Sequence, residues 1–190
     1  MSPEAQSILK VFSLIYNLTK EDELRKVLNT IGELEYKAAL ESLDNLKMAN
    51  NKESQLYSVI YHLESAYNLF ERNARKQFAW SDLLPLVGHI YHMDRIGDFA
   101  KMSQTSLLIA WCYSKLNEKS LCIKYSNKAL ANFNTYINKS VEAKIDHDEM
   151  DNHTFPTDTV LTRDKRRDRY RKELEPAKQK LEEKIIAIKS

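Results

Sequence analysis

The scarcity of glycine and proline is the feature that most limits what this chain can fold into. The 190 residues contain 3 Gly and 4 Pro, which is 7 of 190 or about 4%, whereas average proteins contain roughly 12% of the two together. All-β folds need a turn every few residues, and those turns depend on the same two residues. Doubly wound α/β folds also need glycine where a strand passes into a helix. We therefore expect an all-α fold built from long helices.

The charge of the chain is almost balanced as a whole but is unevenly distributed. With 29 Lys+Arg and 27 Asp+Glu the net charge is +2, which by itself demands neither a nucleic acid nor a membrane as partner. Residues 163–190 carry 11 basic and 6 acidic side chains, a net +5, so the first 162 residues are left with −3. The chain is predicted to have a mildly acidic body and a basic tail.

No segment of the chain is typical of a membrane span or of a secretory signal. The sequence has no run of 18 apolar residues, which is the length that a membrane helix needs. Its first residues lack the basic region of a signal peptide, and the apolar stretch from Ile8 to Leu18 is interrupted by polar residues. We expect no membrane partner and a cytoplasmic protein.

Apolar residues recur at the spacing of one helix face along most of the chain. The predicted helices, about seven in number, cover residues 3–18, 19–48, 52–76, 81–93, 97–116, 119–137 and 162–188. Gly32 is expected to break the second of them, and Gly97 with Asp98 is expected to form a turn. A further tight turn is expected at Asn117. Pro176 is expected to kink or split the last helix, because proline cannot donate a helix hydrogen bond.

Acidic and turn-forming residues crowd together between Val141 and Thr159. Among the acidic residues are Asp146, Asp148, Glu149, Asp151 and Asp158. This composition favours a loop or a disordered linker. The sequence thus divides into a helical-hairpin domain (1–140), an acidic linker (141–160) and a basic C-terminal helix (161–190) that docks on the domain or on a partner.

The segment Ala110 to Leu130, AWCYSKLNEKSLCIKYSNKAL, places small residues where two antiparallel helices would have to approach closely. The positions concerned are Ala110, Cys122 and Ala129, and Tyr113 supplies an aromatic ring beside them. In this pattern, over roughly residues 103–136, the chain resembles a tetratricopeptide repeat, the helix–turn–helix unit of about 34 residues. The resemblance implies a stack of antiparallel helical hairpins, with aromatic residues lining an inner face on which such proteins usually hold peptides.

Three histidines, His62, His89 and His92, are candidates for a polar pocket. A helix would place His89 and His92 on one face, because they are three residues apart. Neither Glu-x-x-His nor His-Glu-x-x-His occurs in the chain, so a metal site is not favoured. The favoured interpretation is packed or exposed helix histidines, and a small-molecule or metal-dependent enzyme with a pocket near them is the alternative.

Two further groups of chemically active side chains have plain structural interpretations. Cys112 and Cys122 have no histidine nearby in sequence, so they are predicted to be reduced core thiols. The second group is Asp146, His147, Asp148, Asp151 and His153. It lacks the central glycine and the closing glutamate of a calcium loop, so a solvated linker is favoured over weak divalent-cation binding.

The strongest charge feature is a basic segment in the last helix. Its cations are Arg163, Lys165, Arg166, Arg167, Arg169, Arg171 and Lys172. Asp164 and Asp168 lie at the spacing that pairs them with Arg167, Arg171 and Lys172 within one helix. A solvated or protein-docking helix is favoured, and binding of a nucleic acid or of an acidic protein surface through this segment remains open.

No motif in the sequence indicates catalysis. A glycine-rich phosphate loop, a Ser/His/Asp arrangement and a spaced carboxylate pair are all missing, so neither an enzyme nor a cofactor nor a metal is expected. We expect a non-catalytic scaffold or adaptor that binds a protein or peptide. The candidate partner-binding residues are Tyr61, His62, His89, Tyr91, His92 and Trp111. An apolar stripe on the last helix (Leu174, Leu181, Ile185 and Ile188) leaves a homodimer open as well.

Overall fold

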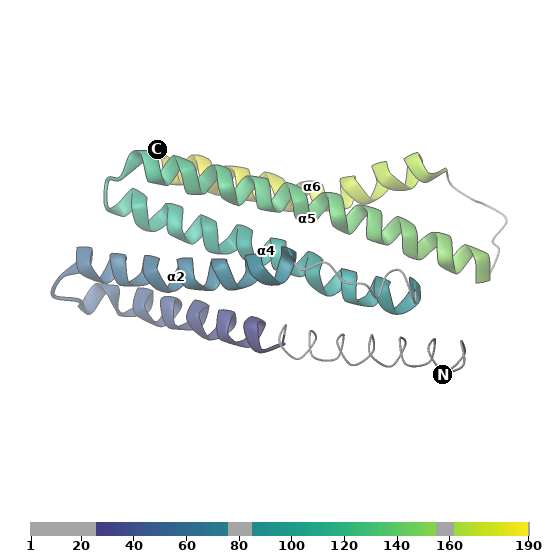
Figure 1. The fold of residues 1–190 in the computed structure, drawn as a ribbon. Coiled ribbons are helices and arrows are strands. Elements are labelled where there is room, and N and C mark those ends of the chain that lie inside the picture. The colour runs from purple at the N-terminus through teal and green to yellow at the C-terminus, as the bar shows by residue number, and fades with distance from the viewer. Residues whose placement is uncertain (1–25, 76–84, 155–161, 190) are drawn as a thin grey trace, which may run out of the picture.

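The computed structural model describes residues 26–75, 85–154 and 162–189, and these residues are almost entirely helical (Figure 1). The elements are a helix over residues 26–44, here called the first described helix, the short 3-10 helix η1 (Asn45–Met48), α2 (Lys52–Arg75), α4 (Pro85–Lys115), α5 (Lys119–Thr154) and α6 (Arg163–Lys189). The described residues include no strand, which confirms the all-α prediction. They form five α-helices rather than seven. The helix predicted over 3–18 lies outside the described residues.

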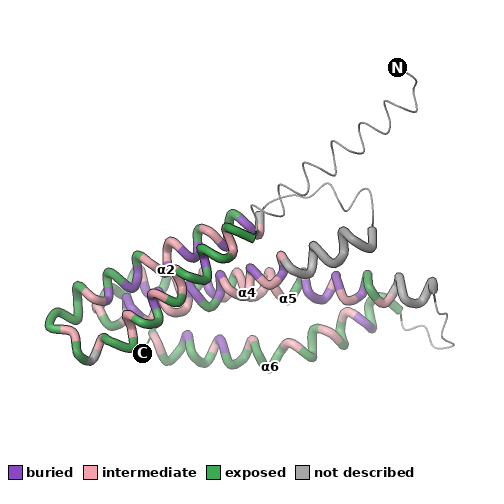
Figure 2. Tube along the Cα trace, turned by 90° about the horizontal axis from the view of Figure 1, so that it is seen from below, coloured by how far each residue is buried: buried purple, intermediate pink, exposed green. Residues whose placement is uncertain are grey.

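The helices stack side by side in chain order, and each runs antiparallel to the one before it (Figure 1). α2 packs on α4, α4 packs on α5, and α6 returns along α5 and also contacts α4. Only Arg166, Leu181 and Ile185 of α6 are buried, so this helix forms an outer layer whose other side is exposed (Figure 2). No helix in the described part of the chain has the length and apolar character to span a bilayer.

The core is made of apolar side chains that face each other across the first described helix, α2, α4 and α5. Its largest cluster contains Ala39, Leu56, Val59, Ile60, Leu63, Ile109, Cys112, Tyr113 and Cys122. A smaller cluster around Phe70 and Met102 continues it toward the other end of α2. Burial of these side chains, at ~1.5–3 kcal/mol each, is the main force that holds the stack together.

α4 and α5 meet through a seam of small buried residues, as the repeat-like pattern implies. The seam consists of Ser103, Ser106 and Ala110 on α4 and Cys122, Ser126 and Ala129 on α5. Because the side chains are small, the Ser103 hydroxyl can donate a hydrogen bond of 2.8 Å to the backbone carbonyl of Ala129 on the other helix. The predicted turn at Asn117 is confirmed, with a φ of 60°, a left-handed conformation that asparagine tolerates.

α4 and α5 are longer than the helices of a tetratricopeptide repeat. They contain 31 and 36 residues, so each alone is about as long as a whole repeat unit of roughly 34 residues. The small residues that carry the resemblance, Ala110, Cys122 and Ala129, are buried. Membership of the repeat family stays a prediction.

The breaks predicted at glycine are wrong, because both helices continue through them. Gly32 lies inside the first described helix, where it lets the ring of Phe70 approach the backbone. Gly97 and Asp98 lie in the middle of α4. Asp98 does not cap a helix but is buried and accepts a hydrogen bond of 2.7 Å from the Nδ2 of Asn73 on α2. The hydrogen bond with Asn73 thus explains why a polar residue stands at position 98 inside a helix.

The loop predicted from Val141 onward is also wrong as far as Thr154, since α5 continues to that residue. Val141 and Ile145 are buried in a cluster that Tyr170 and Leu174 of α6 cover. Two acidic residues of this stretch, Glu142 and Asp146, pair with Arg163 and Arg167 at the basic start of α6. Residues 155–161 lie outside the described residues.

The last helix is confirmed, and it docks on this same chain. Pro176 lies inside α6 without splitting it, and the helix bends near its middle (Figure 2), as a missing hydrogen bond at proline allows. The apolar stripe that left a homodimer open is used within the chain, because Leu181 and Ile185 are buried, and Leu174 and Ile188 pack against the core clusters.

The two helical glycines give a matched test of the packing. A Cβ at Gly32 would lie 2.8 Å from a ring carbon of Phe70, whereas a Cβ at Gly97 meets nothing within 4 Å. Alanine favours a helix by about 1 kcal/mol over glycine, but overpacking costs ~1–3 kcal/mol. In urea unfolding we expect Gly97→Ala to stabilise the protein by up to about 1 kcal/mol and Gly32→Ala to destabilise it. Equal stability of the two variants would contradict the close contact with Phe70.

Candidate functional site

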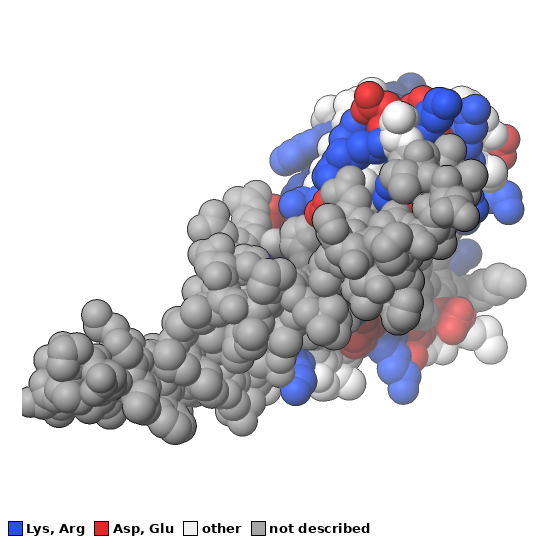
Figure 3. Space-filling view, turned by 90° about the vertical axis from the view of Figure 1, so that its right-hand side faces the viewer, with Lys and Arg blue, Asp and Glu red and all other residues white. Residues whose placement is uncertain are grey.

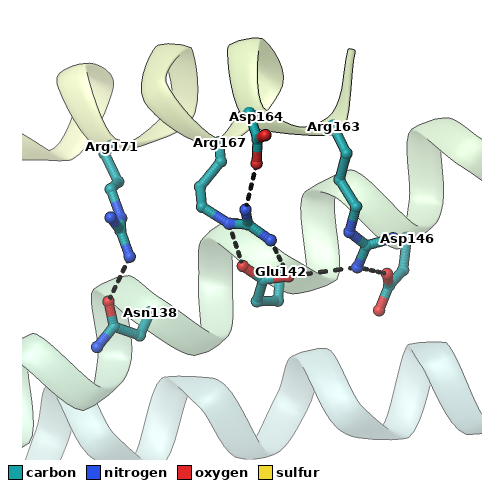
Figure 4. A network of polar contacts seen from close by, with 7 residues as sticks. All are labelled: Asn138, Glu142, Asp146, Arg163, Asp164, Arg167 and Arg171. Carbon is teal, nitrogen blue, oxygen red and sulfur yellow. Dashed lines mark hydrogen bonds and ion pairs between the residues drawn. The ribbon is translucent and has the colours of Figure 1, made fainter.

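The basic segment of α6 is tied to α5 by a ladder of polar contacts (Figure 4). Arg167 donates through Nε to Oε1 of Glu142 at 2.7 Å. Arg163 donates through Nη2 to Oδ1 of Asp146 at 2.8 Å and to Oε2 of Glu142 at 3.3 Å. A third rung joins the Nη2 of Arg171 to the Oδ1 of Asn138 at 3.5 Å. We call these six residues the α5–α6 ladder.

The regular spacing of the ladder follows from helix geometry. Its members are four residues apart on each helix, about one helical turn, so antiparallel helices bring each arginine opposite one partner. The hydrogen bond from Arg167, and then that from Arg163, hold the pKa of the Glu142 carboxyl below its usual value against the opposing effect of burial. Sequence reasoning missed Asn138 and Glu142, although four-residue spacing in both segments is a signal for such a ladder.

The other cations of the basic segment do not form a uniformly basic face. Arg166 is buried. Lys165, Arg169 and Lys172 line a shallow surface hollow together with Asp168 and Glu173. Figure 3 shows the same mixture of basic and acidic side chains on this side of the molecule. Because carboxylates lie among these cations, the arrangement is less suited to a phosphate backbone than the sequence alone suggests.

The intrahelical ion pairs expected in this helix are present in part. Asp164 pairs with Arg167 at 2.8 Å, as predicted. Glu173 forms an ion pair with Arg169 at 3.6 Å and another with Lys144 of α5 at 3.0 Å. The segment is thus a docking helix within its own chain.

Of the three histidine candidates, only His62 has a side chain that the structure describes. The Nδ1 of His62 on α2 lies 2.6 Å from Oε2 of Glu35 on the first described helix, so this histidine joins two layers of the stack. Tyr61 is 71% exposed, and its ring meets that of His62 edge-on. The side chains of His89, Tyr91 and His92 lie outside the described residues. Among the described residues no group of three or more His, Cys, Asp or Glu is arranged to hold a metal ion.

Aromatic and polar side chains bridge α2 and α5. The Tyr125 hydroxyl donates a hydrogen bond to Glu64, and the Lys128 ammonium lies 3.7 Å from the centre of the Tyr67 ring. Burial, followed by this hydrogen bond and the charge of Glu64, raises the pKa of Tyr125. Asn132 donates to the Tyr67 hydroxyl at 3.3 Å. These side chains form hydrogen bonds and a cation–π contact with one another, so they hold α5 against α2.

The two cysteines are buried, as predicted. Burial raises the pKa of the Cys112 thiol to about 12, so the thiol stays protonated and unreactive at neutral pH. Cys122 faces the edge of a surface hollow but is only 4% exposed. Both residues act as small apolar side chains in the main core cluster.

An open apolar groove lies where the end of α6 meets α4 and the start of α5. Its larger hollow, of about 520 Å³, is lined by Leu107, Leu108, Trp111, Ser114, Lys115, Lys184, Ala187 and Ile188. A smaller hollow of about 220 Å³ lies on the other side of Ile188 and is lined by Ser114, Asn117, Lys119, Cys122, Ile123, Ile188 and Lys189. We call the two hollows together the Trp111 groove. Of the predicted partner-binding residues only Trp111 lines it.

The rim of the Trp111 groove is basic. Four lysines, Lys115, Lys119, Lys184 and Lys189, line its two hollows, and neither hollow is lined by an aspartate or a glutamate. The Lys115 ammonium lies 5.6 Å from the centre of the Trp111 ring, within the range of a cation–π contact. The groove therefore combines an apolar floor with positive charge at its rim.

Neither a known protein family, nor a characterised protein, nor a solved structure matches the chain.

The lowered pKa of Glu142 predicts a pH dependence of stability. Since the folded-state pKa lies below the unfolded one, the Glu142 contacts stabilise the fold above the unfolded pKa, and this contribution is lost as the pH falls through the folded pKa. In urea unfolding at low salt from about pH 6 to about pH 3, we expect Glu142→Gln to lose less stability than the natural chain. Because Glu142 is 43% exposed, the difference should be small and should shrink with added salt.

A suitable control is Glu175→Gln, which removes an exposed carboxyl on α6 outside the ladder. It should follow the pH profile of the natural chain. Identical profiles for Glu142→Gln and the natural chain would show that the ladder contributes nothing to stability.

Proposed function

We propose that this protein is a non-catalytic helical scaffold that binds a segment of another protein in the Trp111 groove. The observation that carries the proposal is the groove itself, an apolar hollow of about 520 Å³ with a polar rim. Hollows of roughly 300–1,000 Å³ with apolar walls and a few polar groups are typical binding sites. Tryptophan is also among the residues that contribute most to binding at protein interfaces.

The other candidate surfaces support this choice, because their polar groups are already used within the chain. Arg163 and Arg167 contact α5, and Tyr125 and Lys128 bridge α5 to α2. By contrast, Trp111 is only partly buried and lines an open hollow. The Trp111 groove is thus the surface best suited to a partner in the described part of the chain.

The walls of the groove are held by the core, which favours a preformed site. Trp111 and Ile188 pack against the main apolar cluster, and the preceding turn of α6 is anchored by the buried Ile185. A rigid groove loses little conformational entropy when a partner binds, and this raises affinity.

The proposal can be tested by blocking the groove with a large side chain. Ala187 is exposed and lines the larger hollow, and Ala177 is exposed on the same helix but lies outside it. We expect Ala187→Arg to reduce partner capture from a cell extract at least tenfold, measured by quantitative mass spectrometry. Ala177→Arg is the matched control and should capture as the natural chain does.

A photo-crosslinking residue at each position gives an independent measurement. Position 187 should cross-link to the captured protein, and position 177 should not. Both arginine variants should unfold at the temperature of the natural chain, so that a loss of capture reflects the groove. Equal capture by the two variants, or an enzymatic activity that one substitution abolishes, would contradict the proposed function.

A further inference from the structure

We infer that the partner segment is acidic and amphipathic: a short helix with bulky apolar side chains on one face and Asp or Glu beside them. This inference rests on the proposed function, since it specifies the chemistry of what the Trp111 groove binds. It depends on two observations about the groove, the charge of its rim and the nature of its floor.

In the described part of the chain, the lysines of the groove keep their charge unpaired beside an apolar floor. Several other lysines meet carboxylates, as in Lys101–Glu33 at 2.5 Å and Lys144–Glu173 at 3.0 Å, but no described aspartate or glutamate lines either hollow of the groove. Within the described residues none of the four groove lysines forms an ion pair, and Lys115 contacts only the ring of Trp111. The rim therefore keeps its positive charge available to a partner.

The positions of these lysines fit carboxylates on both sides of a bound helix. Lys115 and Lys184 line the larger hollow from α4 and from α6, whereas Lys119 and Lys189 line the smaller one. A segment lying over Ile188 would thus have cations beside it at each hollow. Complementary charge at a rim increases the association rate and disfavours partners of the wrong sign.

The floor of the groove favours aliphatic and aromatic protein side chains over nucleotide bases. Leu107, Leu108 and Ile188 line the larger hollow with aliphatic side chains, and Ile123, which is 48% exposed, extends the apolar floor at the smaller hollow. Proteins that bind single-stranded nucleic acids present aromatic faces on which successive bases stack. Here the floor offers a single aromatic ring, that of Trp111, and a lysine already lies near it.

The test uses three labelled synthetic helices that differ only in charge. The first has a Leu/Phe face flanked by glutamates, the second has glutamines in place of the glutamates, and the third has lysines there. Binding to the full chain is measured by fluorescence anisotropy at low and high salt. We expect the acidic helix to bind at least tenfold more tightly than the glutamine helix, the lysine helix to bind most weakly, and the preference to shrink with salt.

Charge variants of the protein give the reciprocal test. The double variant Lys115→Gln/Lys184→Gln should lose at least tenfold in affinity for the acidic helix and little for the glutamine helix. The control Lys172→Gln/Lys180→Gln removes two exposed lysines of α6 outside the groove and should leave both affinities unchanged.

The outcomes separate this inference from the proposed function. Equal binding of the acidic and glutamine helices, with both lost in Ala187→Arg, would overturn the inference and leave the groove as a protein-binding site. Failure of all three helices to bind would also overturn it, and the cross-linking experiment would still judge the groove itself. Tighter binding of a single-stranded RNA, lost in the groove double variant, would overturn both.

Discussion

The close approach of α4 and α5 is the constraint on which the rest of the structure depends. Small buried residues, such as Ser103 and Ala129, let the two backbones come near enough for a hydroxyl of one helix to reach a carbonyl of the other. The resulting hairpin presents one side to α2 and another to α6. Larger residues in this seam would push α4 and α5 apart. The surfaces on which α2 and α6 pack would then be separated.

Local features of the sequence predicted the fold class and several helix ends. Helical spacing of apolar residues located α2 and α6, and Asn117 marked the turn between the longest helices because its side chain tolerates a left-handed conformation. The predictions failed where a polar or flexible residue has a long-range partner. The pair Gly97 and Asp98 predicts a turn, yet Asp98 accepts a hydrogen bond inside a helix from Asn73, which is 25 residues away in sequence.

The same limitation explains what was found and what was missed at the candidate site. The sequence predicts Trp111 as a candidate partner-binding residue. Its neighbours in the groove, Lys184 and Ile188, lie more than 70 residues further along the chain. The sequence shows that the last helix has an apolar stripe, but the surface on which the stripe packs depends on how far α5 extends. Because the acidic residues after Val141 predict a loop, the last turns of α5 and the way in which α6 packs on them were not predicted.

The repeating spacing of the α5–α6 ladder has a consequence for how α6 is aligned. If α6 slid by four residues, about 6 Å along its axis, Arg167 would face Asp146 and Arg171 would face Glu142, so most of the charge pairing would be kept. The ladder attracts the two helices without choosing between these alignments. At the other end of α6, Leu181 and Ile185 are buried and Ile188 packs against the main core cluster. The wall that α6 contributes to the Trp111 groove therefore depends on apolar packing at one end of the helix, at a distance from the charges that hold the other end.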